Sequence, residues 1–255
     1  MYQASRCYTI QAGAYVILLM ETLSAVKPAQ VMVVTPHPDD AEFGVAGSVA
    51  RWTRKGKVVI YVVCTSGDKG TDDPNLKPEA LAKIREKEQL KAAELLGVRE
   101  VIFLRHPDQG LEDSPEFRKE LARLIRMYRP ETVITVDPYR RYIWHRDHRI
   151  TAQVTLDAVF PYARDVHAYP DLLQEGLQPH KVKEVLLWAS PEVNHRVDIT
   201  DTFETKLAAL RCHQSQVGTE LATSLEEWLR DMAREMAEGE DFALAEGFHR
   251  EQIWR

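Results

Sequence analysis

Two clusters of histidine and aspartate, far apart in the chain, carry the side chains best suited to chemistry. The first spans residues 36–40 (PHPDD) and comes directly after an apolar run, residues 31–35. The second spans residues 145–148 (HRDH) and again follows a strand-like run. A catalytic zinc ion typically takes three protein ligands from histidine and carboxylate side chains and leaves a position for water. The two clusters therefore indicate a hydrolytic metal site.

The positions of the clusters support this interpretation. In open α/β sheets, ligands bind just beyond the carboxyl ends of the strands, which is where both clusters are expected to fall. His37 and Asp40 are separated by two residues across a tight strand-to-helix turn, so both can face one point. His148 would supply the third metal ligand from the second cluster. Asp39 cannot easily point the same way as its neighbour, which leaves it free for a different role.

The remaining members of the clusters suit the other steps of a hydrolysis. A metal lowers the pKa of a bound water, and a carboxylate such as Asp39 can then take a proton from it. His145 lies three residues before His148 and could meet the oxyanion of a tetrahedral intermediate. Asp147 could orient or charge that histidine, as carboxylates often do.

Each of these residues also has an ordinary structural interpretation. A histidine and an aspartate at a turn more often form a hydrogen bond than bind a metal. Asp147 could cap a helix that begins near Arg149, and His148 alone could be a surface histidine. The conjunction of two polar clusters at two predicted strand ends is what favours the metal site.

Strand-like and helix-like patterns alternate along the chain. Apolar runs predict strands at residues 31–35, 58–64, 100–104, 132–136 and 182–189, and helical periodicity predicts helices at residues 44–54, 78–96, 115–128 and 149–160. Such repeated units predict an α/β fold, a Rossmann-like three-layer sandwich with a mostly parallel sheet and helices on both faces. From Asp201 onward we expect a helical, charged segment in which Trp228, Phe242 and Phe248 are packing anchors.

Composition limits the classes of protein and partner. The chain has 255 residues, and we expect one domain over residues 31–255 after an N-terminal extension, residues 1–30, with Met20 as an alternative start to Met1. The net charge of −6 argues against a nucleic-acid partner, and no apolar stretch is long enough to predict a transmembrane helix. Three scattered cysteines favour a reducing, cytoplasmic location without disulfides. No GxGxxG motif follows the first strand, which disfavours a dinucleotide cofactor.

Further segments complete a family resemblance. They are residues 65–70 (TSGDKG), the helix motif with Arg85, Glu88, Ala92 and Leu96-Gly97, residues 107–111 (PDQGL), and Lys206 with residues 213–216 (HQSQ). Together with the two clusters, these motifs resemble those of the PIG-L/LmbE-like zinc-dependent N-acetylglucosamine deacetylases. The resemblance extends from about residue 31 to residue 216.

The resemblance implies a role for each matching position. The family's metal ligands fall on His37, Asp40 and His148, and its general base falls on Asp39. The histidine that stabilises the oxyanion and protonates the leaving amine falls on His145, with Asp147 tuning it. Two further positions, Arg85 and Asp108, match residues that touch sugar hydroxyls in relatives.

This chain departs from the family pattern in its first motif. Many members have an acid directly after the second aspartate, whereas here Ala41 intervenes and the acid is Glu42. The wide loop at residues 137–142 is most similar to that of the diacetylchitobiose deacetylase-like branch. That branch implies a homo-oligomer, often a hexamer, in which a neighbouring subunit's tail approaches the site. His249 is a candidate for this contact.

The predicted function is hydrolysis of an N-acetyl group from an N-acetylglucosamine-type sugar or glycoconjugate, with release of acetate. Zinc is the expected cofactor, although Fe²⁺ or another divalent ion also suits two histidines and an aspartate. A metal-dependent phosphoesterase and a non-catalytic sugar-binding protein are the alternatives. The particular amino-sugar substrate and the roles of His106 and His213 stay open at this point.

Overall fold

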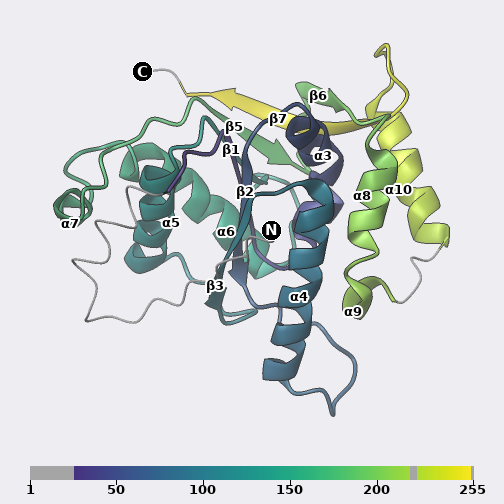
Figure 1. Ribbon diagram of the computed structural model, residues 1–255, viewed down its shortest axis with the longest axis horizontal. Helices are drawn as coiled ribbons and strands as arrows, with labels where there is room; N and C mark the ends of the chain where they lie inside the picture. Colours follow the sequence, from purple (N-terminus) through teal and green to yellow (C-terminus); the bar gives the residue numbers. More distant parts are fainter. Residues whose placement is uncertain (1–25, 219–222, 254–255) are drawn as a thin grey trace, which may run out of the picture.

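The computed structural model describes residues 26–218 and 223–253 of the chain. Most of the expected N-terminal extension, including both candidate start residues, therefore lies outside the described residues. Within them, one sheet organises the fold (Figure 1).

The sheet has the strand order β3-β2-β1-β4-β5-β7-β6. Its strands are β1 (Val31–Thr35), β2 (Val59–Thr65), β3 (Glu100–His106), β4 (Thr132–Val136), β5 (Glu184–Trp188), β6 (His195–Asp198) and β7 (Ala245–Gln252). The first five strands pair in parallel, and β7 runs antiparallel to both β5 and β6. The predicted mostly parallel α/β sheet is confirmed.

Helices cover both faces of this sheet (Figure 1). The helices are α2 (Asp40–Gly44), α3 (Ala46–Arg54), α4 (Pro78–Leu96), α5 (Pro115–Tyr128), α6 (Arg146–Asp157), the π-helical turn η1 (Ala158–Tyr162), α7 (Pro170–Gln174), α8 (Phe203–Leu210), α9 (Gln214–Val217) and α10 (Thr223–Met236). Helices α3, α4, α8 and α10 lie on one face and α5 and α6 on the other (Figure 1). This arrangement is the expected three-layer sandwich.

The burial of the central strands follows from these two helical layers. Every residue of β1, β2 and β4 is buried, because a sheet covered on both faces has no solvent side. Successive side chains of a strand point to opposite faces. Accordingly, Val31 and Val33 pack in one core and Met32 and Val34 in the other. Continuous apolar runs, rather than alternation, were therefore the correct signal for these strands.

The expectation of a purely helical C-terminal part is wrong. Helices α8 and α10 are present, but the chain returns to the sheet as β7. Phe248 is fully buried as expected, although it lies on this strand, whereas the side chain of Trp228 is 52% exposed and does not anchor the core. Strand β7 buries the carboxylate of Glu246 beside Lys206, and such a charged strand resembles a solvated helix in sequence.

Two helix boundaries also differ from the sequence prediction. The segment 44–54 is divided, because Val45, with φ −141°, separates α2 from α3. Helix α6 begins at Arg146, and its N-cap is His145, so the alternative of Asp147 as an N-cap is wrong. No helix in the described part of the chain is long and apolar enough to cross a membrane.

Candidate active site

The two predicted clusters meet at the carboxyl edge of the sheet. The first follows β1 and the second follows β4, and these two strands are direct neighbours. The strand order changes direction at this pair. Strands β2 and β3 follow β1 toward one edge of the sheet, whereas β5 follows β4 toward the other edge. Such a switch point is where open α/β sheets bind their ligands.

His37 lies at the centre of the site, with carboxylates against both ring nitrogens. Its Nδ1 is 3.1 Å from Asp40 Oδ2, and its Nε2 is 3.2 Å from Asp108 Oδ1 and 3.3 Å from Asp147 Oδ2. Burial acts to lower the pKa of His37, but these three neighbouring carboxylates outweigh it and raise the pKa to about 11. The pocket is thus built to hold a positive charge at this ring.

The Asp40 carboxylate connects His37 to His148. Its Oδ2 faces His37, and its Oδ1 lies 3.3 Å from His148 Nε2. Burial acts to raise the pKa of Asp40, but the two histidines outweigh it and lower the pKa, while burial lowers the pKa of His148. The site therefore offers an ionised carboxylate beside a neutral imidazole at neutral pH.

This donor set fits a zinc ion. Two ligands on one tetrahedral zinc, each about 2.0–2.1 Å from the metal, lie about 3.3 Å apart. Asp40 meets this separation with a different oxygen for each ring, Oδ2 at 3.1 Å from His37 Nδ1 and Oδ1 at 3.3 Å from His148 Nε2. Ring nitrogens of His37, His145 and His148 also lie within 4.8 Å of one another. We favour Asp40 over His145 as the third ligand because its two oxygens face the other two residues directly.

Asp39 has a strained backbone and a buried, paired carboxylate. Its φ of 103° places it in the left-handed region that non-glycine residues rarely adopt. Its Oδ2 accepts a hydrogen bond from Arg85 at 3.1 Å, and its backbone N–H donates to the side chain of Gln89 at 3.0 Å. Burial and the charge of Asp40 raise the pKa of Asp39, while the guanidinium of Arg85 opposes them. Such a carboxylate is suited to general-base chemistry.

His145 is exposed at the mouth of the site, and its tautomer follows from its cap. Its Nδ1 accepts a hydrogen bond from the backbone N–H of Asp147 at 3.2 Å. A neutral ring that accepts at Nδ1 carries its proton on Nε2. The ring lies 4.6 Å from that of His37, centroid to centroid. His145 therefore has a donor available beside the predicted metal ligands.

Asp147 and Asp108 are almost fully buried, and their carboxylates act on His37. The carboxylate of Asp147 also accepts the backbone N–H groups of Gln109, at 2.6 Å, and Leu111, at 3.2 Å. Asp147 therefore contacts His145 through its backbone N–H and not through its carboxylate. Carboxylates that hold the second nitrogen of a metal-binding histidine fix its tautomer and orientation.

Arg85, predicted to touch sugar, is directed into the protein. Its side chain is only 5% exposed, and it donates to Pro38 O and to Gly67 O as well as to Asp39. Gly67 has φ +59°, and a Cβ at this position would lie 2.4 Å from Arg85 Nη1, so only glycine leaves room for the guanidinium. The sugar-binding roles of Arg85 and Asp108 stay predictions.

The three histidines with open roles lie outside this cluster. His106 pairs with Glu120 at 2.7 Å and packs on the ring of Phe117. His213 is fully buried and hydrogen-bonds Glu42 at 3.1 Å. On β7, His249 contacts Glu192 O and the carboxylate of Glu251, and its predicted contact with a neighbouring subunit stays a prediction.

Sequence reasoning assigned no role to Gln89, whose side chain bonds the backbone of Asp39. The helical spacing of α4 could have indicated that Gln89 is buried and has a specific partner. The buried face of this helix includes Arg85, Glu88 and Gln89 between Leu81 and Ala92. Polar residues on the buried face of a helix are expected to have specific partners.

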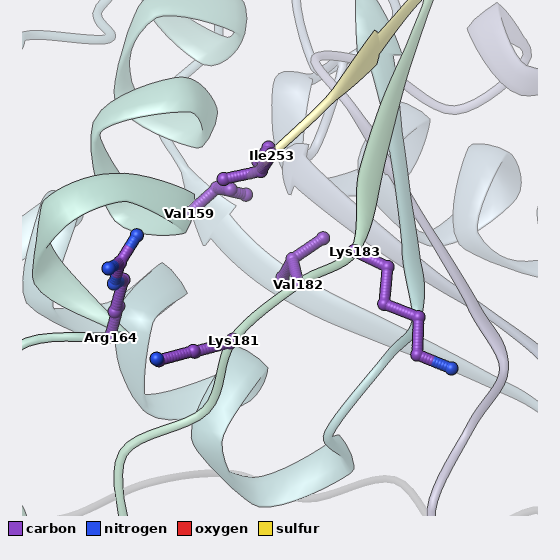
Figure 2. A pocket seen from close by; sticks show the side chains of 6 residues that line it. All are labelled: Val159, Arg164, Lys181, Val182, Lys183 and Ile253. Carbon is purple, nitrogen blue, oxygen red and sulfur yellow. The ribbon is translucent and has the colours of Figure 1, made fainter. Parts of the chain in front are cut away.

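A separate cavity of about 320 Å³ lies at the amino end of β5, away from these residues. Its lining consists of Val159, Arg164, Lys181, Val182, Lys183 and Ile253 (Figure 2). The side chain of Lys183 extends away from those of Arg164 and Lys181, so the three cations do not converge on one point (Figure 2). None of its lining side chains is a carboxylate or an imidazole, and it does not contribute to the site above.

Comparison with known proteins agrees with the geometry of the site. A family model described as PIG-L: GlcNAc-PI de-N-acetylase matches residues 32–159. The chain is 34% identical over 218 residues to the diacetylchitobiose deacetylase of Thermococcus kodakarensis, with 86% of this chain and 81% of that protein covered. It is 27% identical over 229 residues to a probable N-acetyl-alpha-D-glucosaminyl L-malate deacetylase 2 of Bacillus anthracis, with 88% and 93% covered.

A solved structure supports the same relationship. The N,N'-diacetylchitobiose deacetylase of Pyrococcus horikoshii, complexed with its inhibitor MPG, superposes with a TM-score of 0.83 at 33% identity. The superposition covers 92% of this chain and 90% of that one. The match therefore includes both clusters and the sheet edge on which they lie.

Proposed function

Because this chain belongs to the PIG-L family of metal-dependent deacetylases, we propose that it removes the N-acetyl group from an N-acetylglucosamine-type sugar or glycoconjugate and that its metal is zinc. The observation that carries the proposal is the placement of Asp40 between His37 and His148, next to the buried carboxylate of Asp39. The relatives are named for diacetylchitobiose and for N-acetylglucosaminyl malate, which supports an amino-sugar substrate.

His37, Asp40 and His148 would hold the zinc ion. When bound, zinc would polarise the amide carbonyl and lower the pKa of a nearby water molecule toward neutrality. Asp108 and Asp147 keep the proton of His37 on Nε2, which leaves the Nδ1 lone pair facing Asp40 and the metal position.

Asp39 acts as the general base in this proposal. It takes a proton from the water molecule that attacks the carbonyl carbon of the acetamide. As the C–N bond breaks, Asp39 rather than His145 passes this proton to the departing amine, because the Nε2–H of His145 is used on the oxyanion. Burial would otherwise favour the neutral form of this carboxylate, so the ion pair with Arg85 keeps enough of it ionised to accept the proton.

His145 stabilises the charge that develops on the carbonyl oxygen. Its Nε2–H donates to the oxyanion, because its Nδ1 is already occupied by the backbone N–H of Asp147. The N-cap position fixes the ring at the start of α6, and His148 lies one turn further along the same helix. The oxyanion donor and one metal ligand are thus held on one rigid element.

The test is acetate release by purified protein that has been stripped of metal and then reloaded with zinc or with Fe²⁺. The substrate panel contains N-acetylglucosamine, diacetylchitobiose and an N-acetylglucosaminyl malate. Asp39→Asn is the matched variant, and it should keep one zinc per chain while losing acetate release. Zinc bound at one per chain without acetate release from any compound would contradict the proposal.

We also propose that the chain forms a homo-oligomer. The resemblance to the diacetylchitobiose deacetylases implies that this oligomer is a hexamer. The 34% identity to such an enzyme supports it. Light scattering of the purified chain measures the mass directly, and a mass of 29.2 kDa, that of one chain, at assay concentration would contradict it.

A further inference from the structure

We propose that Gln89 is a positioning residue for the general base, and that the buried pair of Glu42 and His213 fixes its orientation. The inference rests on the proposed function, which gives Asp39 the role of the base. Gln89 does not contact the metal ligands through any hydrogen bond described above. It acts on the backbone of Asp39.

The backbone of Asp39 needs an external restraint. Its φ of 103° is costly for a residue with a Cβ, and such a conformation persists only where the surroundings hold it. The carbonyl of Asp39 accepts the N–H groups of Glu42 and Phe43, which belong to α2. Its own N–H, on the side of the preceding loop, donates to Gln89 Oε1 at 3.0 Å. Gln89 therefore restrains the strained side of this residue, together with Arg85, which donates to Pro38 O of the same peptide unit.

The orientation of the Gln89 amide follows from its two partners. The backbone N–H of Asp39 can only donate, so it requires the amide oxygen. The amide nitrogen of Gln89 donates to Glu42 Oε1 at 3.0 Å, while the other oxygen of that carboxylate faces His213. A rotation of the amide by 180° would place two donors together at one end and two acceptors together at the other.

The far end of this chain of hydrogen bonds is anchored in the core. Glu42 Oε2 lies 3.1 Å from His213 Nε2, and both side chains are fully buried. Gln89 is also fully buried. Hydrogen bonds without access to water are costly to leave unmade, so Glu42 and His213 hold the carboxylate in one place. That carboxylate in turn holds the amide of Gln89.

Helix α4 thus fixes the base at two points. Arg85 holds the carboxylate oxygen of Asp39, and Gln89, one turn later on the same helix face, holds its backbone. Loss of Gln89 would leave both contacts of Arg85 in place but would remove the partner of the Asp39 N–H, and so loosen the backbone dihedrals that aim the carboxylate. Misplacement of a catalytic group by about 1 Å can cost about a hundredfold in rate.

The test compares Gln89→Leu, Gln89→Glu and the exchanged double variant Gln89→Glu/Glu42→Gln. In the double variant, the carboxylate introduced at position 89 can accept the N–H of Asp39. The amide introduced at position 42 can donate to that carboxylate while its oxygen accepts from His213. All three hydrogen bonds are then restored, with the direction of the middle one, between positions 89 and 42, reversed. Gln89→Glu alone places two carboxylates face to face.

We expect Gln89→Leu and Gln89→Glu to lower kcat about tenfold to a hundredfold at unchanged KM and zinc content. The double variant should recover most of this loss. Thr132→Val is the control for lost stability, since it removes a 2.8 Å hydrogen bond to Glu184 at the opposite edge of the sheet and should leave kcat unchanged. A wild-type kcat in Gln89→Leu, or a double variant no more active than Gln89→Glu, would overturn the inference.

A second measurement does not depend on activity. Hydrogen exchange at the Asp39 amide, followed by NMR, should be slow in the wild-type protein and at least about tenfold faster in Gln89→Leu. If the wild-type protein released no acetate, the proposed function would fail, and this exchange rate would still test the restraint. Equal exchange rates in the two proteins would overturn it.

Discussion

Zinc binding by the metal-free protein should release close to one proton per chain at pH 6. The proton comes from His37, whose ring lies between Asp40 on one side and Asp108 and Asp147 on the other. Burial acts to lower its pKa, but these carboxylates raise it to about 11, so the metal-free ring is an imidazolium at pH 6. A histidine binds a metal only as the neutral imidazole, and the second proton must leave.

The other ligands contribute little to this count. The neighbouring histidines lower the pKa of Asp40 against the effect of burial, so it is already ionised. Burial lowers the pKa of His148, so that ring carries less of a proton than an ordinary histidine at this pH. At pH 6 a water molecule held by zinc keeps both protons, because its pKa is about 7. Asp39→Asn removes the remaining group whose ionisation the metal would change. In that variant the protons released on zinc binding should come mainly from His37.

The sign of the pH dependence follows from the same proton. Because protons compete with zinc for His37 at every pH below about 11, fewer protons mean tighter binding. One released proton corresponds to about a tenfold gain in affinity, or about 1.4 kcal/mol, for each unit of pH. Asp39→Asn should therefore bind zinc about tenfold more tightly at pH 7 than at pH 6.

Isothermal titration calorimetry in buffers of different ionisation enthalpy gives the number of protons directly. His106→Gln serves as the control, because His106 pairs with Glu120 outside the site, and it should leave the count unchanged. Full zinc loading without proton release would refute the reasoning. It would mean that His37 is neutral before zinc arrives or that His37 is not a ligand.

Three further predictions follow from single contacts. Asp39→Asn should keep its zinc and lose about 10²–10⁴-fold in kcat for acetate release, and a smaller loss would assign the base elsewhere. Arg85→Met removes a cation that lowers the pKa of Asp39, so the acidic limb of the plot of kcat/KM against pH should move to higher pH; an unmoved limb would contradict the pairing. Phe248→Ala empties a fully buried site on β7 and should cost about 3–5 kcal/mol in the free energy of unfolding measured with urea, with zinc stoichiometry unchanged.

The parts of the fold that the sequence predicted best are those that a covered parallel sheet makes unambiguous. The predicted bounds of β1 and β4 coincide with the observed ones, as do those of α4 and α5. A strand buried on both faces must be apolar throughout, and helices that cover it must be amphipathic. Strand β7 escaped prediction because its buried Glu246 is satisfied by Lys206, a partner that only the tertiary structure supplies.

The candidate site also contains residues that the sequence predicted and contacts that it did not. Residue type and strand-end position were enough to bring together His37, Asp40 and His148, which the structure places in contact through Asp40. The partners of those residues were not predictable. The contact of Asp108 with His37, for example, depends on how the loop after β3 reaches the first cluster, while the predicted role of Asp108 toward the sugar stays a prediction. Such contacts depend on the course of a loop, which has no periodic signal.

The geometry of α2 explains what changes when Ala41 follows Asp40 and the acid is Glu42, which is where this chain departs from the family's first motif. Successive helical residues are rotated by about 100°, so Asp40 and Glu42 lie about 200° apart on opposite sides of α2. Asp40 faces His37 and His148, while Glu42 faces Gln89 and His213. Ala41 is only 1% exposed, so its methyl group belongs to the core between these two directions.

An acid placed directly after Asp40 in this chain would project into that core position instead. Exchanging the two residues, with Ala41→Glu and Glu42→Ala, would remove the acceptor of the Gln89 amide and the partner of His213 at once. It would also bury a charge where the chain now has a methyl group, which is strongly unfavourable without a partner. The intervening alanine therefore determines which side of α2 receives the second acid. In this chain that side holds Gln89, which we propose positions Asp39.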